Sequence, residues 1–451
     1  MQNMLSRDWF GRAWVLQEAV LARHAVIRCG RFEEDWKVFC AFVCDYRRYY
    51  RDDARGLVKG TWQYNGLDGN RDRMNLAMSK ELEMLRWINL PFSIATISAA
   101  RTDGLEIPIL QLLGYVRLQS ATDARDKVYA IMGLLSEDQR SRLPRPDYDA
   151  EVMEVYIALA ASVVLSSRSL DVLAWKNPYV EPFFTGMPSW VPDWRSLQEA
   201  GNVGNERVQM PVISPRHGAE PFGTYDPVHN ASLYPISPYN FDFTNERVLH
   251  ARGVHVDAVA DWSEQIGGLD SLPPPRYKED FTFHQEQILD SPLRDMRTKL
   301  VDSNTLTSDA FWRIVSHDQY IKRLNRYRSE TRRLGKEGYT TLGGVKFPPV
   351  TPEDEEAILK LEYRSGIELK GARDLILRTR TGYWGAFPRN TRPGDTVVVL
   401  FGARKPVLLR KHRSFHVFVG ECYVHGIMGG EVMLGKQIQN YEAETEVFHI
   451  A

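Results

Sequence analysis

The chain has 451 residues, too many for one ordinary hydrophobic core, and its 43% hydrophobic and 25% charged residues are typical of a soluble globular protein with two or three domains. Lys and Arg number 57 against 58 Asp and Glu, which excludes a strong overall charge that would draw nucleic acid or an acidic membrane to the protein. The sequence has no apolar run of about 18 residues and no secretory signal, so we expect a cytoplasmic protein without a membrane span.

The four cysteines, Cys29, Cys40, Cys44 and Cys422, are too few for a disulfide framework and are typical of a reducing compartment. Cys40 and Cys44 fall on one predicted helix and could share a metal ion. No CxxC pair or nearby histidine completes a tetrahedral set around them. We therefore interpret both as core thiols and expect no metal and no other cofactor.

The first predicted elements are a helix and a short strand within Arg7–Gly30. The helix is expected to run to about Ala22, with Ser6 or Asp8 as its cap. The β-branched alternation of His24–Cys29 predicts a strand that needs a sheet to join. One stripe of the helix is apolar and is interrupted by a single amide, and its members are Phe10, Trp14, Gln17 and Leu21. Trp14 lies at the centre of this stripe, which predicts a core position.

A mostly helical region is expected to follow. The predicted helices are Phe32–Tyr50, about Met74–Ile88, Ile107–Val116, Ala121–Leu135 and about Ala150–Leu165, with a polar loop at Arg51–Arg73. Thr122 or Asp123 could cap the Ala121–Leu135 helix. We interpret Arg125 and Asp126 as an ion pair that anchors the start of this helix rather than as catalytic groups.

A strand at Leu170–Trp175 and an extended loop at Met187–Trp194 come next. Pro188 and Pro192 fix the backbone of the loop, so Trp190 and Trp194 are expected to anchor it in the core. Asp193 could be read as a catalytic carboxylate, but a carboxylate in such a loop is more often bonded to loop N–H groups.

Gly201–Asn240 is rich in Pro, Gly, Asn and Ser and is expected to be a linker or insertion. Val248–Val259 alternates as a strand and places His250 and His255 on opposite faces, which argues against a metal shared by these two. Phe281–Arg333 is predicted to be helical and charged. Its Lys and Arg residues could indicate a nucleic-acid contact, but Glu330 interrupts the basic run and aromatic residues are sparse, which favours a solvated helix face.

The C-terminal part of the chain changes to short β-rich runs separated by turns, which predicts a small antiparallel barrel or sandwich. The runs are Asp374–Thr379, Gly382–Phe387, Thr396–Phe401, Pro406–Leu409 and Phe415–Val424. Glu421, Cys422 and His425 could be drawn as a Cys–His site. Cys422 and His425 lie three residues apart in a strand-like run, hence on opposite faces, so a structural role is favoured.

Four separated stretches carry more specific patterns than these: an aromatic helix near the N-terminus, the run DARDKVYAIMGLL, the run MPSWVPDW, and the C-terminal runs GYWGAF, PGDTVVVLFGARKPVLLR and VGECYVHGIMGGE. Their residues are Trp9, Phe10, Arg12, Trp14, Gln17, Glu18, Asp123, Arg125, Asp126, Lys127, Tyr129, Trp190, Pro192, Asp193, Trp194, Gly420, Glu421, Cys422, Tyr423, His425 and Gly426. In this order the stretches resemble the fungal heterokaryon-incompatibility (HET) domain family. The family's earlier Leu-Ser-Tyr-x-Trp-Gly and Cys-Ile-Asn-Gln motifs are not in the chain, so we expect a HET domain without its N-terminal half.

The resemblance implies a mixed α+β fold: a partial α/β remnant of a TIR-like HET domain, a helical middle region and a C-terminal antiparallel β barrel or sandwich. The expected segments are 1–60 for the C-terminal part of the HET domain, 61–200 for a mainly helical region, 201–245 for a linker or insertion, 246–373 for a mixed strand–helix region and 374–451 for a β-rich domain.

The resemblance also implies a role in fungal non-self recognition and the programmed cell death that accompanies it, exerted through association with other proteins or with a second copy of the chain. An alternative is a TIR-like NAD hydrolase, which would need a carboxylate to stabilise an oxocarbenium-like state. Glu18 is the only candidate for that carboxylate. A further alternative is a truncated, non-enzymatic interaction protein. Since the strands that would complete a site around Glu18 are expected to be missing, we expect no NAD hydrolysis by this chain.

Overall fold

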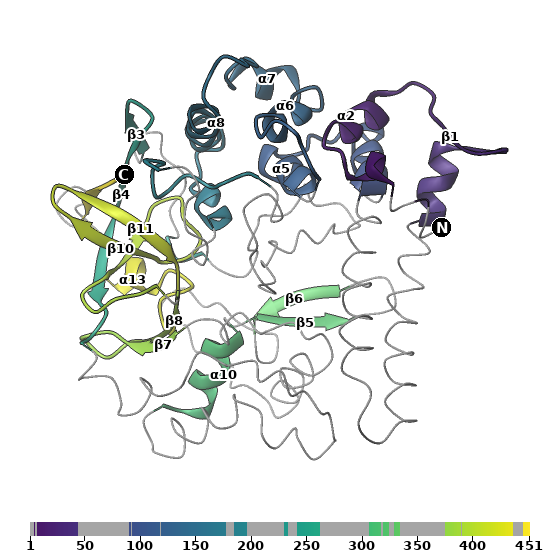
Figure 1. Cartoon of the computed structure of the whole chain (residues 1–451). Helices are drawn as coiled ribbons and strands as arrows, with labels where there is room; N and C mark the ends of the chain where they lie inside the picture. The colour runs from purple at the N-terminus through teal and green to yellow at the C-terminus, as the bar shows by residue number, and fades with distance from the viewer. Residues whose placement is uncertain are drawn as a thin grey trace, which may run out of the picture. The chain divides into compact units, whose positions relative to one another are not determined.

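A computed structural model of the chain describes Met4 and residues 7–43, 90–91, 93–117, 119–176, 185–195, 230–232, 241–261, 306–316, 319–323, 329–333, 375–388, 390–435 and 445–451. These residues divide into two compact units (Figure 1). Unit 1 lies within Met1–Ser162 and Asp193–Gly223, and unit 2 within Val163–Pro192, Thr224–Leu324 and Ser329–Ala451. Unit 1 is largely helical and unit 2 contains a β barrel, so the expected mixed α+β class is confirmed.

Unit 1 begins with a 3-10 turn, a helix and a hairpin. They are η1 (Asp8–Gly11), α2 (Trp14–Leu21), β1 (Val26–Cys29) and β2 (Phe32–Asp35). The residue before α2 is Ala13, which makes no side-chain capping bond because its methyl group has no acceptor. The predicted cap by Asp8 is therefore wrong, and Ser6 lies outside the described residues.

The strand predicted at His24–Cys29 forms as β1, and it pairs with the segment that follows it. The antiparallel register runs from Val26 opposite Asp35 to Cys29 opposite Phe32, with Gly30 in the turn at φ 61°. Phe32 was expected to begin a helix, but residues 36–43 are helical instead. The start is set by Asp35, whose Oδ1 accepts hydrogen bonds from the backbone N–H of Lys37 at 2.7 Å and of Val38 at 3.4 Å.

The middle of unit 1 contains helices close to those predicted. They are α5 (Ile109–Arg117), α6 (Asp126–Met132), α7 (Glu137–Ser141) and α8 (Val152–Ser167), the last of which continues into unit 2. Helix α7 begins with a capping box, in which the Ser136 hydroxyl accepts from the backbone of Gln139 and the Gln139 side chain accepts from the backbone of Ser136. The apolar faces of α5, α6 and α8 are buried, so this region has a continuous helical core.

Unit 2 begins with a short helical segment at the place where a strand was predicted. Leu170–Trp175 was expected to be a strand, but η2 (Asp171–Trp175) is a 3-10 helix. The Ser169 hydroxyl accepts a hydrogen bond from the N–H of Asp171 at 3.0 Å, which favours a tight turn there. The apolar residues Val172, Leu173 and Trp175 are all buried, and this burial does not need the alternation of a strand.

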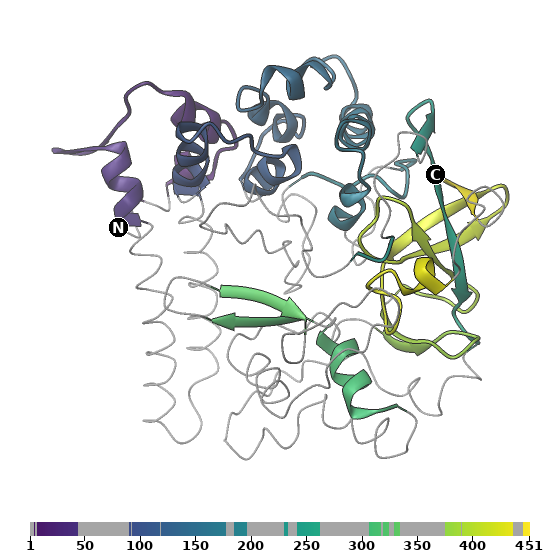
Figure 2. The same ribbon diagram turned by 180° about the vertical axis from the view of Figure 1, so that it is seen from behind.

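The main feature of unit 2 is a closed five-stranded barrel, drawn in teal and yellow in Figures 1 and 2. The strand order is β13–β11–β10–β9–β4, and pairing of β13 with β4 closes the barrel, while β3 extends from β4. The strands are β3 (Phe241–Thr244), β4 (Val248–Ala258), β9 (Thr396–Leu400), β10 (Val407–His412), β11 (Phe415–Glu421) and β13 (Glu446–Ile450). The pairing of β11 with β13 is parallel, whereas the other barrel pairings are antiparallel.

Two of these strands differ from the prediction made from the sequence. Strand β4 lies outside 374–451, so the barrel depends on a strand far upstream of its C-terminal runs. Strand β13 was not among the predicted strands. Gly253 of β4 allows the close approach of β9, since a Cβ there would lie 2.6 Å from the carbonyl oxygen of Val399.

A second sheet packs beside the barrel within unit 2. It has the order β12–β8–β7, formed by Tyr423–Val424, Trp384–Phe387 and Leu375–Arg378. Helix α13 (Glu431–Gly435) follows β12 along the chain. The barrel and this sheet share one apolar cluster, which consists of Val259, Leu377, Phe387, Val397, Leu408, Val419, Cys422, Val424 and Ile427.

The charged segment predicted as one helix, Phe281–Arg333, is wrong in its last part. Helix α10 covers Ser308–Ser316, but β5 (Gln319–Arg323) and β6 (Ser329–Arg333) form an antiparallel pair. The register places Lys322 opposite Glu330. A pattern of alternating charge is therefore compatible with a two-stranded ribbon as well as with a solvated helix face.

The predicted helix at Met74–Ile88, the loop at Arg51–Arg73, Cys44 and most of the predicted linker Gly201–Asn240 lie outside the described residues. Within the part of the chain that the structure describes, no helix is long and apolar enough to cross a membrane.

Asp257 of β4 is only 6% exposed and links the barrel to the turn after β7. Burial alone would raise its pKa, but hydrogen bonds from Thr379, Thr381 and the backbone of Ala258 hold the pKa below its ordinary value. Its contribution to stability is therefore present above the pKa of the unfolded chain, about 3.9, and is lost as the pH falls through the lower pKa of the folded state.

We expect Asp257→Asn to lower the free energy of unfolding at pH 7 by about 2 kcal/mol, because it weakens several hydrogen bonds to a charged acceptor. We also expect the variant to lose less stability than the parent between about pH 5 and pH 3. Urea unfolding across this pH range measures both effects. Parallel pH profiles for parent and variant would contradict the assignment.

Candidate functional site

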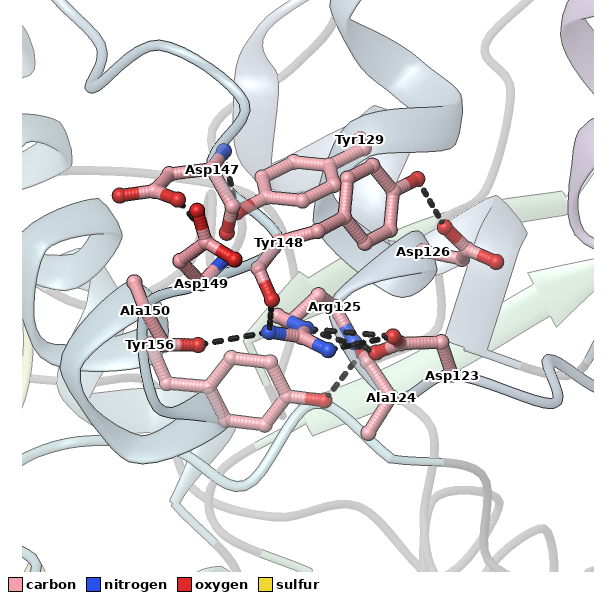
Figure 3. Close-up of polar contacts among 10 residues, drawn as sticks. All are labelled: Asp123, Ala124, Arg125, Asp126, Tyr129, Asp147, Tyr148, Asp149, Ala150 and Tyr156. Carbon is pink, nitrogen blue, oxygen red and sulfur yellow. Dashed lines mark hydrogen bonds and ion pairs between the residues drawn. The ribbon is translucent and has the colours of Figure 1, made fainter.

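The most connected group of polar side chains in unit 1 lies at the start of α6 and is shown in Figure 3. We call it the Arg125 cluster. It comprises Asp123, Arg125, Asp126, Tyr129, Tyr148 and Tyr156. Four of these residues come from α6 and the turn before it, and the last two come from the loop before α8 and from α8 itself.

Arg125 and Asp123 form a bidentate ion pair. The Arg125 side chain donates from Nε to Oδ1 at 3.0 Å and from Nη2 to Oδ2 at 2.7 Å, and its backbone N–H donates to Oδ1 at 2.9 Å. The hydrogen bond from the Arg125 side chain holds the pKa of Asp123 below its ordinary value and, in return, raises that of Arg125. Such a paired fork fixes the direction of the guanidinium as well as its charge.

This geometry corrects two predictions about the start of α6. The ion pair joins Arg125 to Asp123 and not to Asp126. Neither Thr122 nor Asp123 caps the helix, because Arg125 itself is the residue before α6 and no side chain caps there. Asp123 instead bonds the N–H two residues further on, which orders the turn that leads into the helix.

The remaining Arg125 donors reach across to the loop before α8. Nη1 donates to the carbonyl oxygen of Ala150 at 2.7 Å and also to that of Tyr148 (Figure 3). The guanidinium carbon lies 5.3 Å from the centre of the Tyr148 ring, within the range of a cation–π contact. One side chain therefore joins the turn before α6 to the start of α8.

Two tyrosines add further bonds to the same loop. The Tyr148 hydroxyl donates to Oδ1 of Asp126 at 2.7 Å, and burial together with this carboxylate raises the pKa of Tyr148 to about 12. The Tyr129 hydroxyl donates to the carbonyl oxygen of Asp147 at 2.7 Å and accepts from the N–H of Asp147 at 3.0 Å. The rings of Tyr129 and Tyr148 meet edge to face at 5.1 Å.

The cluster is closed on its other side by Tyr156 of α8, whose hydroxyl donates to the carbonyl oxygen of Ala124 at 2.9 Å (Figure 3). The arrangement satisfies backbone carbonyls and N–H groups with side chains from neighbouring elements. The side chains of the cluster therefore bind the protein's own backbone, and these bonds order the loop at residues 147–150.

The N-terminal helix carries a second connection to α6. Oε1 of Gln17 accepts a hydrogen bond from the N–H of Gly133, at the residue that ends α6, with an N···O distance of 3.1 Å. A Cβ on Gly133 would lie 2.6 to 2.8 Å from the Gln17 amide, so any other residue there would push this side chain aside. Arg12 forms a parallel bridge with Ser120, which holds the same two segments together.

The other residues of the N-terminal motif form an aromatic cluster. Phe10 is buried, and Trp9 meets Phe10 and Trp36 edge to face at 4.9 and 5.7 Å. Trp14 is only half-buried, so its predicted core position is wrong, and Ala13, Val15 and Leu16 are buried instead. The extended backbone of Arg12 breaks the phase between Phe10 and α2, so the apolar stripe read from the sequence is not continuous.

Comparisons with known proteins find two similarities. Residues 353–442 match the Het-6 beta-barrel domain. Over 484 aligned positions the chain is 23% identical to the protein named Heterokaryon incompatibility protein 6, OR allele, of Neurospora crassa, and the alignment covers 95% of this chain. Both matches support a heterokaryon-incompatibility (HET) family protein. The chain spans 65% of the length of that relative, and no solved structure matches it.

The two tryptophans of the MPSWVPDW loop, Trp190 and Trp194, are both buried, as predicted. In unit 2, Trp190 is fully buried and its Nε1 donates to the carbonyl oxygen of Arg247 at 3.0 Å. In unit 1, Trp194 is buried, and Asp193 accepts from Nε of Arg195 at 2.9 Å and from its backbone N–H at 3.1 Å. Pro192 lies between these anchors in the extended segment.

The C-terminal motif residues are part of the barrel and its neighbouring sheet. Gly420 and Glu421 belong to β11, where Glu421 accepts from Nζ of Lys405 at 3.4 Å. Cys422 is buried and its Sγ lies 3.5 Å from the carbonyl oxygen of Pro406, while the N–H of His425 donates to Trp384. Tyr423 is buried in β12, and Gly426 adopts φ 92° in the turn that follows. The structure places these residues in turns and strand contacts.

Glu18 lies on the exposed side of α2, whereas Lys127 of α6 is buried. Tyr148 and Tyr156 were not among the predicted site residues. An aromatic residue directly before a predicted helix, as in Pro146–Asp147–Tyr148, is the local signal that could have found the first of them.

The Arg125 cluster predicts that Arg125→Lys, which keeps the charge but removes the fork, will loosen the loop before α8. We expect a lower melting temperature and faster amide exchange at residues 147–150, with Arg145→Lys, an exposed neighbour, as the matched control. Hydrogen exchange followed by mass spectrometry measures both variants. Equal exchange in parent and Arg125→Lys would show that the carbonyl contacts do not hold the loop.

The contact between Gln17 and Gly133 predicts a coupled pair. Gly133→Ala should displace the Gln17 amide and cost about 1 kcal/mol of unfolding free energy, and Gln17→Ala should cost a similar amount, because each removes the same hydrogen bond. The double variant should cost clearly less than the sum. Gly11→Ala is the control, since a Cβ there has nothing within 4 Å. Strict additivity in urea unfolding would argue against the contact.

Proposed function

We propose that this protein acts in heterokaryon incompatibility by associating with other proteins, and that this association contributes to programmed cell death when incompatible cells fuse. The observation that carries the proposal is the alignment of 95% of the chain with a protein named for heterokaryon incompatibility. The match of residues 353–442 to the Het-6 beta-barrel domain supports it independently.

The geometry favours association over catalysis. The motif residues Asp123, Arg125 and Tyr129 bond to neighbouring turns and loops, and Gln17 bonds to the end of α6. Groups used in this way build a rigid body, whereas a catalytic site directs its polar groups at a bound substrate. These polar groups therefore hold the fold together, which supports a role in association rather than in catalysis.

We propose the cytoplasm as the site of this activity, in line with a content of only four cysteines in 451 residues. A fluorescent fusion of the full chain in a filamentous fungus tests the location. Accumulation of the fusion in secretory compartments would contradict it.

The function itself is tested by inducing the full chain in fungal strains of different incompatibility genotypes and fusing them pairwise. We expect dead fusion cells in some pairings and normal growth in others, with partner proteins recovered by affinity capture only from the reactive pairings. Glu18→Gln is the informative variant: association predicts unchanged cell death, whereas an NAD hydrolase predicts its loss together with loss of NAD consumption. Normal growth of every fused pair would overturn the proposal.

A further inference from the structure

Two histidines face each other where the barrel closes. His449 of β13 lies opposite His250 of β4, and Asp242 of β3 lies opposite His250 on its other side, so the three residues form one row across adjacent strands. The Nδ1 atoms of the two histidines are 2.5 Å apart, and the ring centres are 4.7 Å apart with the planes at 79°. His449 is exposed and His250 is half-buried, so solvent reaches the pair.

Two nitrogen atoms this close together need a hydrogen or a metal cation between them. Each neutral imidazole has one lone pair and one N–H, and two lone pairs aimed at each other repel. A single proton on one Nδ1 removes the repulsion in the empty pair. A metal cation can bond to both nitrogens at once, whereas a proton is bound to one nitrogen and only hydrogen-bonded to the other.

The contacts around His250 prepare it as a ligand. Its Nε2 lies 2.6 Å from the hydroxyl oxygen of Thr244 on β3. When Nε2 donates its hydrogen to this hydroxyl, Nδ1 carries the lone pair, and this is the tautomer that a ligand through Nδ1 requires. Histidine ligands in metal sites commonly have such a partner on the second ring nitrogen, because it fixes both the tautomer and the ring direction.

We propose that His250 and His449 bind a divalent transition-metal ion through their Nδ1 atoms, with Zn²⁺ as the reference ion. Binding displaces the shared proton to solvent and forms two metal–nitrogen bonds. Tetrahedral bonds of about 2.0 to 2.1 Å require the nitrogens to be about 3.3 Å apart, so the pair must open by roughly 0.8 Å. A small rotation of the exposed His449 ring supplies this movement.

The site has two protein ligands. Among the residues that the structure describes, no group of three or more His, Cys, Asp or Glu is arranged to hold a metal, so water completes the shell. The Asp242 carboxylate is exposed, and its Oδ1 already accepts from the N–H of Phe243 at 2.7 Å, so it contributes charge rather than a bond. Imidazole ligands favour Zn²⁺, Ni²⁺ and Cu²⁺ over Mg²⁺ and Ca²⁺.

Binding at this position joins β4 to β13. Each member of the pair belongs to a different strand of the closing ladder, and the strands come from distant parts of the chain. The unfolded chain does not hold the two histidines together, so the ion binds the folded barrel more tightly and raises its melting temperature.

The experiment is thermal unfolding and equilibrium dialysis of the full chain with ZnCl₂, NiCl₂ and MgCl₂. We expect Zn²⁺ and Ni²⁺, but not Mg²⁺, to raise the melting temperature in a saturable way. His449→Asn should remove this shift and lower the bound Zn²⁺ by one ion per chain. The matched control is His255→Asn on β4, the strand of His250, where the side chain is exposed and is not part of the row; this variant should keep the shift.

A second measurement covers the case in which His449→Asn weakens the barrel itself. Cu²⁺ bound to the parent protein should show electron paramagnetic resonance with coupling to two imidazole nitrogens, and the variant should lose that signal. Zn²⁺ that leaves the melting temperature of the parent unchanged, or that stabilises parent and His449→Asn equally, would overturn the proposal. Neither outcome depends on the function in cell death.

Discussion

The helical unit depends most on the hydrogen bonds that the Arg125 guanidinium donates. The guanidinium pairs with Asp123 on one side and with the carbonyl oxygens before α8 on the other, so a single planar group orders two turns that have no regular backbone pairing of their own. A loop without regular hydrogen bonds needs side chains to satisfy its carbonyls, and arginine does this with several donors in one fixed plane. Three tyrosine hydroxyls add further hydrogen bonds: Tyr129 bonds to the backbone of Asp147, Tyr148 to the carboxylate of Asp126, and Tyr156 to the carbonyl oxygen of Ala124.

The barrel of unit 2 follows a different principle, because backbone pairing along its strands leaves few edges to satisfy. Its closure relies on β4, which pairs with β3, β9 and β13, and on the single parallel contact between β11 and β13. Side chains act where this pairing is interrupted: Asp257 follows the bulge in β4 and bonds to Thr381 across the gap. The two units therefore use charged groups for the same purpose, at the points where regular structure stops.

Local patterns predicted much of this architecture. The β-branched alternation of Val248–Val259 and Thr396–Phe401 and the apolar period of Ala150–Leu165 identified β4, β9 and α8 within a few residues. The failures have particular causes. Asp35 caps a helix inside a segment whose apolar period began at Phe32, and Arg12 breaks the stripe that suggested a core position for Trp14. Neither event changes the periodicity that a sequence window measures.

The candidate site was harder to predict, since its partners are distant. Nothing in the run that contains Arg125 indicates that its second partner is the carbonyl oxygen of Ala150, and backbone acceptors carry no residue identity. The pairing of β13 with β4 is equally invisible, because Glu446–Ile450 is short and lies far from its partner in sequence.

The long separation between β4 and its barrel partners also shapes how the chain is made. During synthesis β3 and β4 leave the ribosome well before β9, β10, β11 and β13 exist, and contacts between distant segments form slowly. In that interval both sides of β4 beyond its short pairing with β3 expose unpaired backbone groups and a strongly apolar face, which is the kind of edge that recruits other strands. The nascent barrel is thus a natural client for chaperones, and the rate at which the later strands arrive bears directly on the yield of native protein.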